Sequence, residues 1–220
     1  MKSLIHKGAL SLSLLLNALL LAVAIFYLSQ VGVSKTVAQL KPAERLDYGY
    51  YATEHFAPLP PARTVLIGDS LIADGQWSEI LDPHAANRGQ SGIQIAEITK
   101  TLEPKLTGEE EVIYLWAGTN NVIAEQSLDQ ITTDYDALLS SIAQRSPQAR
   151  IIAMSIPGTF APAEIDAANA ALQQVAKSHQ AIWVDTSSTA GQHLISDSTH
   201  VNAQGYLALS KELARYLPTG

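Results

Sequence analysis

Short apolar runs recur along the chain from residue 64 onward, and polar or turn-forming residues bound each of them. The clearest runs cover residues 64–67, 111–117, 150–155 and 181–185, and a weaker one covers residues 85–88. Their apolar side chains do not alternate with polar ones, as they would in a strand with one face in water. We therefore predict five strands that are covered on both faces of a sheet.

Between these runs, apolar residues recur at helical spacing. Ser127 and Gln130 have the spacing of a capping box, and an apolar stripe follows them to Ile142. Similar stripes cover residues 165–175 and 207–216. Because strands that alternate with helices are typical of a parallel sheet, we predict an α/β fold for residues 64–220. The expected architecture is a three-layer α/β/α sandwich with a five-stranded parallel sheet, similar to flavodoxin.

The amino-terminal segment has a different pattern. Residues 8–33 carry no charge, and a helix over residues 8–28 would be about 30 Å long, enough to cross a bilayer. Lys2 and Lys7 precede it and would stay in the cytoplasm. We predict a membrane anchor in residues 1–34, with a signal peptide cleaved after residues 22–24 as the alternative. In both cases the following domain lies outside the cytoplasm, in the periplasm or beyond the cell.

Residues 35–63 have a mixed composition and end in a proline-rich stretch, so we predict a linker. Charge is distributed unevenly along the chain. Residues 1–63 carry a net charge of +3 and the remaining residues −10, for a total of −7. Such an acidic domain repels polyphosphate backbones, which argues against a nucleic-acid partner. The chain has no cysteine, which excludes disulfides, cysteine-ligated zinc and a thiol nucleophile.

Four loops carry residues suited to acyl-transfer chemistry. Ser70 follows the first predicted strand at Gly68-Asp69-Ser70, where it is either a nucleophile or a helix N-cap. Gly89 and Asn120 follow the second and third strands, and each is either an oxyanion donor or part of a turn. Asp197 and His200, three residues apart, could orient an imidazole that deprotonates Ser70. A metal site would need further ligands near them, and the sequence offers none.

The four loops, in this order, resemble the SGNH hydrolase superfamily, also called GDSL esterases and lipases, over about residues 64–217. Gly118-Thr119-Asn120-Asn121 and the compact length are similar to its platelet-activating-factor acetylhydrolase branch. The resemblance implies that Ser70 is the nucleophile and that Asp197 and His200 complete the triad. It also implies an oxyanion hole formed by the N–H groups of Ser70 and Gly89 with the Asn120 side chain. Asn121 is a departure, because many relatives have Asp there.

The resemblance implies a serine esterase that needs no cofactor or metal. Its expected substrate is a small acyl ester, such as an O-acetyl group on an envelope glycan, or a lipid ester. An envelope O-acyltransferase would use the same residues, and a non-catalytic envelope-binding module is the alternative from another class. Acyl-chain length and oligomeric state cannot be predicted from the sequence.

Overall fold

The structure is a computed structural model that describes residues 16–23, 25–26, 59–102 and 105–219. By the contacts along the chain, residues 1–44 and 45–220 form two separate units. In the first unit, residues 16–23 and 25–26 are helical. The predicted membrane helix over residues 8–28 lies partly outside the described residues. Within the described ranges, no helix has both the length and the apolar character needed to cross a bilayer.

The second unit is built on a five-stranded parallel sheet with the strand order β2-β1-β3-β4-β5. Its strands are β1 (Thr64–Gly68), β2 (Ala86–Gly89), β3 (Val112–Trp116), β4 (Arg150–Met154) and β5 (Ile182–Val184). All five predicted strands are confirmed, and their ends differ from the prediction by at most one residue. The order places β1 and β3 side by side at the centre, with Gly68 opposite Trp116 where both strands end.

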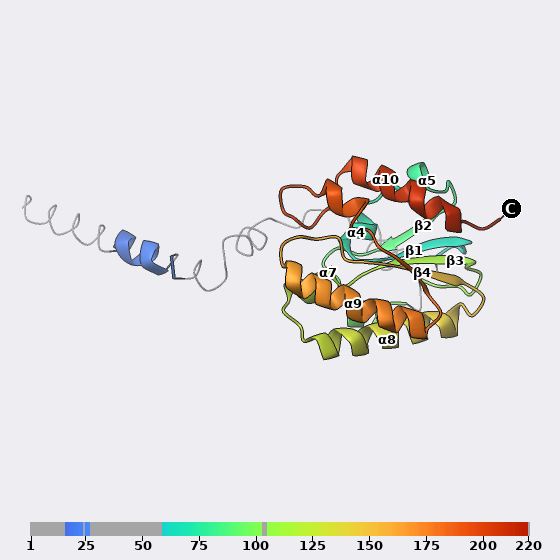
Figure 1. Cartoon of the computed structure of the whole chain (residues 1–220), viewed down its shortest axis with the longest axis horizontal. Coiled ribbons are helices and arrows are strands. Elements are labelled where there is room, and N and C mark those ends of the chain that lie inside the picture. The colour runs from blue at the N-terminus through green and yellow to red at the C-terminus, as the bar shows by residue number, and fades with distance from the viewer. Residues whose placement is uncertain (1–15, 24, 27–58, 103–104, 220) are drawn as a thin grey trace, which may run out of the picture. The chain divides into compact units, whose positions relative to one another are not determined.

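Helices cover both faces of the sheet and make it the middle of three layers (Figure 1). One face packs against α6 (Ile95–Lys100), α8 (Leu128–Arg145) and α9 (Pro162–Ser178). The other packs against α4 (Ser70–Ala73), α5 (Trp77–Ile80) and α10 (Ala203–Leu213). The short helix α7 (Thr119–Ile123) follows β3, and the 3-10 helices η1 (Ala190–His193) and η2 (Ala214–Tyr216) flank α10.

The apolar strand residues divide between two cores because successive side chains in a strand point to opposite faces. Ile113 and Leu115 belong to the core under α6, α8 and α9. Tyr114 and Trp116 belong to the core under α4, α5 and α10. All five residues of β3 are buried, which explains why this strand reads as an uninterrupted apolar run.

The last residues of the predicted linker pack against this unit. Leu59 is buried, and the Arg88 guanidinium donates a hydrogen bond to the Pro60 carbonyl at 3.0 Å. The packed structure therefore includes residues before Thr64, the predicted start of the domain. Proline residues suited to an extended spacer are equally suited to an extended segment that lies on a folded surface.

Candidate active site

Ser70 lies at a tight turn between β1 and α4. Asp69, not Ser70, is the N-cap of α4, and its Oδ1 atom accepts a hydrogen bond from the Leu71 N–H at 3.0 Å. The Asp69 N–H donates to the Trp116 carbonyl at 3.1 Å, which ties the turn to the end of β3. The interpretation of Ser70 as a helix cap is therefore wrong, and its hydroxyl is available for chemistry.

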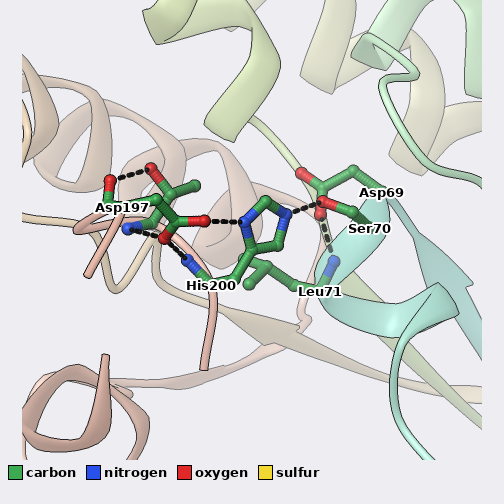
Figure 2. Close-up of polar contacts among 6 residues, drawn as sticks. Asp69, Ser70, Leu71, Asp197 and His200 are labelled. Atoms are coloured by element: carbon green, nitrogen blue, oxygen red, sulfur yellow. Dashed lines mark hydrogen bonds and ion pairs between the residues drawn. The ribbon is translucent and has the colours of Figure 1, made fainter. Parts of the chain in front are cut away.

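The structure brings Ser70 together with His200 and Asp197, although Ser70 and His200 are separated by 130 residues (Figure 2). The Ser70 Oγ atom lies 2.9 Å from His200 Nε2, and His200 Nδ1 lies 2.8 Å from Asp197 Oδ2. Because an ionised carboxylate only accepts hydrogen bonds, His200 must carry its proton on Nδ1. Nε2 is then free to accept the proton of the Ser70 hydroxyl.

The Asp197 carboxylate is fixed by its own loop. Its Oδ1 atom accepts hydrogen bonds from the backbone N–H groups of Thr199, at 3.0 Å, and His200, at 2.9 Å. Partial desolvation opposes ionisation, but these hydrogen bonds and the one from the His200 ring outweigh it and hold the pKa of Asp197 below its ordinary value. The residue therefore stays charged throughout the neutral range and keeps the imidazole in one orientation.

The loop that carries the acid and base is closed on itself and held by a second loop. A β-bridge joins Leu194 to Val201, and the Ile195 N–H donates to the His200 carbonyl at 2.8 Å. The Thr159 N–H, from the loop after β4, donates to the Ser198 carbonyl at 2.9 Å. Ser198 itself adopts a positive φ of 60°, a conformation that costs a non-glycine residue some strain.

The structure gives the predicted oxyanion donor Gly89 a role in packing. A Cβ atom at Gly89 would lie 2.3 Å from the Ala73 backbone nitrogen, so only glycine fits against α4 there. The Gly89 N–H donates to the Asn87 side chain at 3.0 Å and is therefore already engaged. Gly92, in the same loop, has a φ of +77° and open space where a Cβ would stand. This second glycine is not among the predicted site residues, although it is visible in the sequence as Gly-x-x-Gly.

Asn120 joins the loop after β3 to the loop after β2. Its Nδ2 atom donates to the Ile93 carbonyl at 2.8 Å. A primary amide carries two N–H donors, so one remains for an oxyanion. The neighbouring loop also borders an open cavity of about 480 Å³. Its lining residues are Gln90, Ser91, Gly92, Ile93, Glu97, Lys100 and Thr101.

Asn121 connects the same two loops from the interior, and sequence reasoning saw it only as a departure. It is fully buried, and its Oδ1 atom accepts a hydrogen bond from the Ile95 N–H at 3.2 Å. Its Nδ2 atom donates to Gln126, whose own Nε2 donates to Asp134 at 2.9 Å. The donors and acceptors of this network run in one direction, from Asn121 to the Asp134 carboxylate.

We expect Asn121→Asp to destabilise the protein by about 1–3 kcal/mol, because two carboxylates would then compete for one Gln126 amide. The double variant Asn121→Asp with Asp134→Asn reverses the direction of the network and should recover part of the loss. Thermal unfolding of the two single variants and the double variant measures the coupling. Strictly additive losses would contradict a directional network.

A family model described as the GDSL-like lipase/acylhydrolase family matches residues 66–208, from β1 into α10. The chain belongs to this family. The description of the family names lipases and acylhydrolases, enzymes that cleave acyl bonds.

Relatives point to one branch of this family. The platelet-activating factor acetylhydrolase IB subunits alpha2 of Homo sapiens and Rattus norvegicus are 31% identical to this chain over 124 residues. That stretch is 51% of this chain and 52% of each relative, so the chain spans about half the length of the curated relatives it matches.

Solved structures share the fold. A platelet activating factor protein from Streptococcus pneumonia has a TM-score of 0.68 at 23% identity, over 77% of this chain and 89% of that one. The acetylxylan esterase Axe2 from Geobacillus stearothermophilus has a TM-score of 0.57 at 16% identity, over 71% and 94%. The esterase EstA from Pseudoalteromonas sp. has a TM-score of 0.57 at 20% identity, over 70% and 96%.

Proposed function

We propose that this protein is a serine esterase that hydrolyses small acyl esters through a covalent acyl-enzyme. The observation that carries the proposal is the unbroken chain of hydrogen bonds from Asp197 through His200 to Ser70, with distances of 2.8 and 2.9 Å. Nucleophile and base lie within proton-transfer distance, and the base is held in one orientation by a charged carboxylate.

The reaction has two steps. His200 Nε2 takes the proton of Ser70, whose Oγ attacks the ester carbonyl, and His200 then protonates the leaving alcohol. Water, deprotonated by the same nitrogen, attacks the acyl-enzyme and releases the acid together with the restored serine. Asp197 stays ionised and stabilises the imidazolium that forms in each step.

The oxyanion of each tetrahedral intermediate needs donors beside Ser70. In this proposal the Ser70 N–H and the second N–H of Asn120 supply two of them. The third comes from a glycine of the loop after β2. Gly89, the predicted donor, would have to release Asn87 first, whereas Gly92 has the open surroundings that a donor to substrate needs.

A small acyl group, such as acetyl, suits the proposal because relatives that share the fold include an acetylxylan esterase.

We also propose that the enzyme works outside the cytoplasm, on acylated glycans or lipids of the envelope. The uncharged stretch over residues 8–33, preceded by Lys2 and Lys7, supports export or anchoring. Fractionation of the full chain beside a chain that starts at Lys35 tests this location; recovery of both in the cytoplasm would refute it.

The function is tested by hydrolysis of p-nitrophenyl acetate with the wild-type protein and Ser70→Ala. We expect the variant to lose at least about 10³-fold in kcat, because nucleophile and base act as a unit. A fluorophosphonate should add one mass increment to the wild type and none to Ser70→Ala. Ser187→Ala, at an exposed serine that follows β5 at the same edge of the sheet, is the matched control and should retain full activity.

Equal activity in Ser70→Ala and wild type would overturn the proposal. An inactive wild type that still takes the fluorophosphonate on Ser70 would favour acyl transfer to an acceptor other than water. An inactive wild type without labelling would favour a binding module.

A further inference from the structure

The catalytic loop, Leu194–Val201, carries the acid and the base and is tied to the rest of the fold by few polar contacts. Apart from the contact between His200 and Ser70, the described residues give this loop a single hydrogen bond to another element, from the Thr159 N–H to the Ser198 carbonyl at 2.9 Å. Its other hydrogen bonds join residues of the same loop. The position of the base relative to the nucleophile therefore depends in part on where the loop after β4 places Thr159.

The loop after β4, residues 155–161, fits closely against the catalytic loop. Gly158 is buried, and a Cβ atom there would lie 3.2 Å from the Ser198 carbonyl oxygen and 2.7 Å from the Phe160 ring. Ser198 has a φ of 60°, and such a strained conformation persists only where its surroundings hold it. A shift of the loop after β4 would therefore be passed on to Ser198, two residues before His200.

Asn169 fixes the loop after β4 near its start. The Asn169 Oδ1 atom accepts a hydrogen bond from the Ile156 N–H at 2.8 Å, and Nδ2 donates to the Ile156 carbonyl at 3.0 Å. Ile156 is buried, so both of its backbone groups need partners within the protein. One side-chain amide supplies both partners and thereby sets the orientation of the chain on either side of Ile156.

Asn169 lies in the middle of α9, on a helix face that is otherwise apolar. The buried residues of this 17-residue helix are Ile165, Ala168, Leu172 and Ala176. Asparagine is a poorer helix former than alanine, so its place on this face is explained by the two hydrogen bonds to Ile156 and not by the helix itself. Helices α9 and α10 cover opposite faces of the sheet (Figure 1), and Val201 of the catalytic loop packs in the core on the α10 side. Asn169 thus connects a helix of one layer with a loop of the other.

We infer that Asn169 is a positioning residue, which holds the loop after β4 against the catalytic loop and thereby keeps His200 Nε2 at 2.9 Å from Ser70 Oγ. Both hydrogen bonds of its side chain go to Ile156, so its influence on the triad passes through that loop. A small displacement is sufficient, because a misplacement of about 1 Å between reacting groups costs on the order of 10²-fold in rate. This inference rests on the proposed esterase function.

Asn169→Ala removes both hydrogen bonds and leaves a better helix former in α9. We expect kcat on p-nitrophenyl acetate to fall by about tenfold to 10²-fold, with KM unchanged. The rate at which a fluorophosphonate labels Ser70 should fall by the same factor, since labelling uses the same nucleophile and base. The proton NMR signal of the His200 Nδ1–H should remain, because its hydrogen bond to Asp197 lies within one loop. Gln173→Ala, at an exposed amide of the same helix, is the matched control and should keep wild-type values.

A double-variant cycle tests the path through the loop. Thr159→Pro removes the N–H that binds Ser198, and it should lower kcat by a similar factor. In the Thr159→Pro background, Asn169→Ala should lower kcat by less than about twofold more, because the contact through which it acts is already lost. If Thr159→Pro fails to fold, Gly158→Ala takes its place by crowding the same carbonyl. If Asn169→Ala fails to fold, Asn169→Asp takes its place, since it keeps the acceptor for the Ile156 N–H and loses only the donor.

Wild-type kcat in folded Asn169→Ala would overturn the inference, and so would independent, multiplicative losses in the double variant. Loss of the His200 Nδ1–H signal together with activity would also overturn it, because the catalytic loop would then be disrupted and not merely displaced from Ser70. In an enzyme that depends on Ser70, these results refute the role of Asn169 alone. Full activity of Ser70→Ala would instead refute the esterase function, and this inference with it.

Discussion

Asp197→Asn is expected to lower kcat on p-nitrophenyl acetate by about 10⁴-fold with little change in KM. Two backbone N–H groups, from Thr199 and His200, bind Oδ1 of Asp197, so the amide oxygen of the variant must take that position. Its NH₂ group then faces His200 Nδ1 and can only donate to it. The ring proton moves to Nε2, where it points at the Ser70 hydroxyl and prevents proton uptake.

Asp185→Asn is the matched control for this experiment. Asp185 directly follows β5, and its Oδ1 atom, like that of Asp197, accepts a backbone N–H, from Ser187 at 2.9 Å. It has no contact with His200 among the hydrogen bonds of the described residues, so we expect its activity to change less than threefold, roughly the effect of an ordinary exposed substitution. Nitrogen NMR of the His200 ring reports the tautomer directly. Activity of Asp197→Asn within about tenfold of wild type would contradict the assigned geometry.

Gly68→Ala is expected to destabilise the fold by about 3 kcal/mol or more, a drop in Tm of roughly 6–12 °C. A Cβ atom at Gly68 would lie 1.9 Å from the Trp116 carbonyl oxygen and 2.7 Å from the Ile72 side chain. Neither backbone can yield, because the central strands β1 and β3 pair along their whole length. The same displacement would move Ser70 away from His200, so activity should fall with stability.

Gly191→Ala is the control for that prediction. Its Cβ would lie 3.4 Å from the nearest atom, an ordinary contact, and its backbone does not need a positive φ. We expect the free energy of unfolding to change by no more than about 0.5 kcal/mol. Any change should be an increase, because alanine lowers the conformational entropy of the unfolded chain. Thermal unfolding followed by circular dichroism measures both variants. Gly68→Ala with the wild-type Tm would mean that β1 and β3 are not as closely joined as described.

The sequence predicts the sheet well because the apolar runs have a purely local cause. A strand covered on both faces must be apolar at every position, as β3 is. This pattern can be recognised in the sequence without knowing which strands or helices lie next to it. The helix α8 was also predictable, since Ser127 accepts the Gln130 N–H as the capping pattern indicates. The predicted triad rested on the order of the four loops and on the family resemblance. Ser70 follows β1 at the carboxyl edge of the sheet, whereas Asp197 and His200 follow η1.

The extent of the packed unit could not be predicted in the same way. Leu59 and Pro60 belong to a proline-rich stretch that is typical of a linker, yet Leu59 is buried and Arg88 binds the Pro60 carbonyl. An extended segment makes no internal pattern that distinguishes a spacer from a segment lying on a surface.

The sequence by itself thus determined the fold class and the strands and predicted Ser70, Asp197 and His200 as site residues, since these depend on residue type and order along the chain. Tertiary structure decided how each polar atom is used. Hydrogen bonds are directional and short, so the engagement of the Gly89 N–H by Asn87 depends on where the folded backbone places its donors. The burial of Asp69 has the same origin, because its N–H is bound to the Trp116 carbonyl at the end of β3, which is distant from it in sequence.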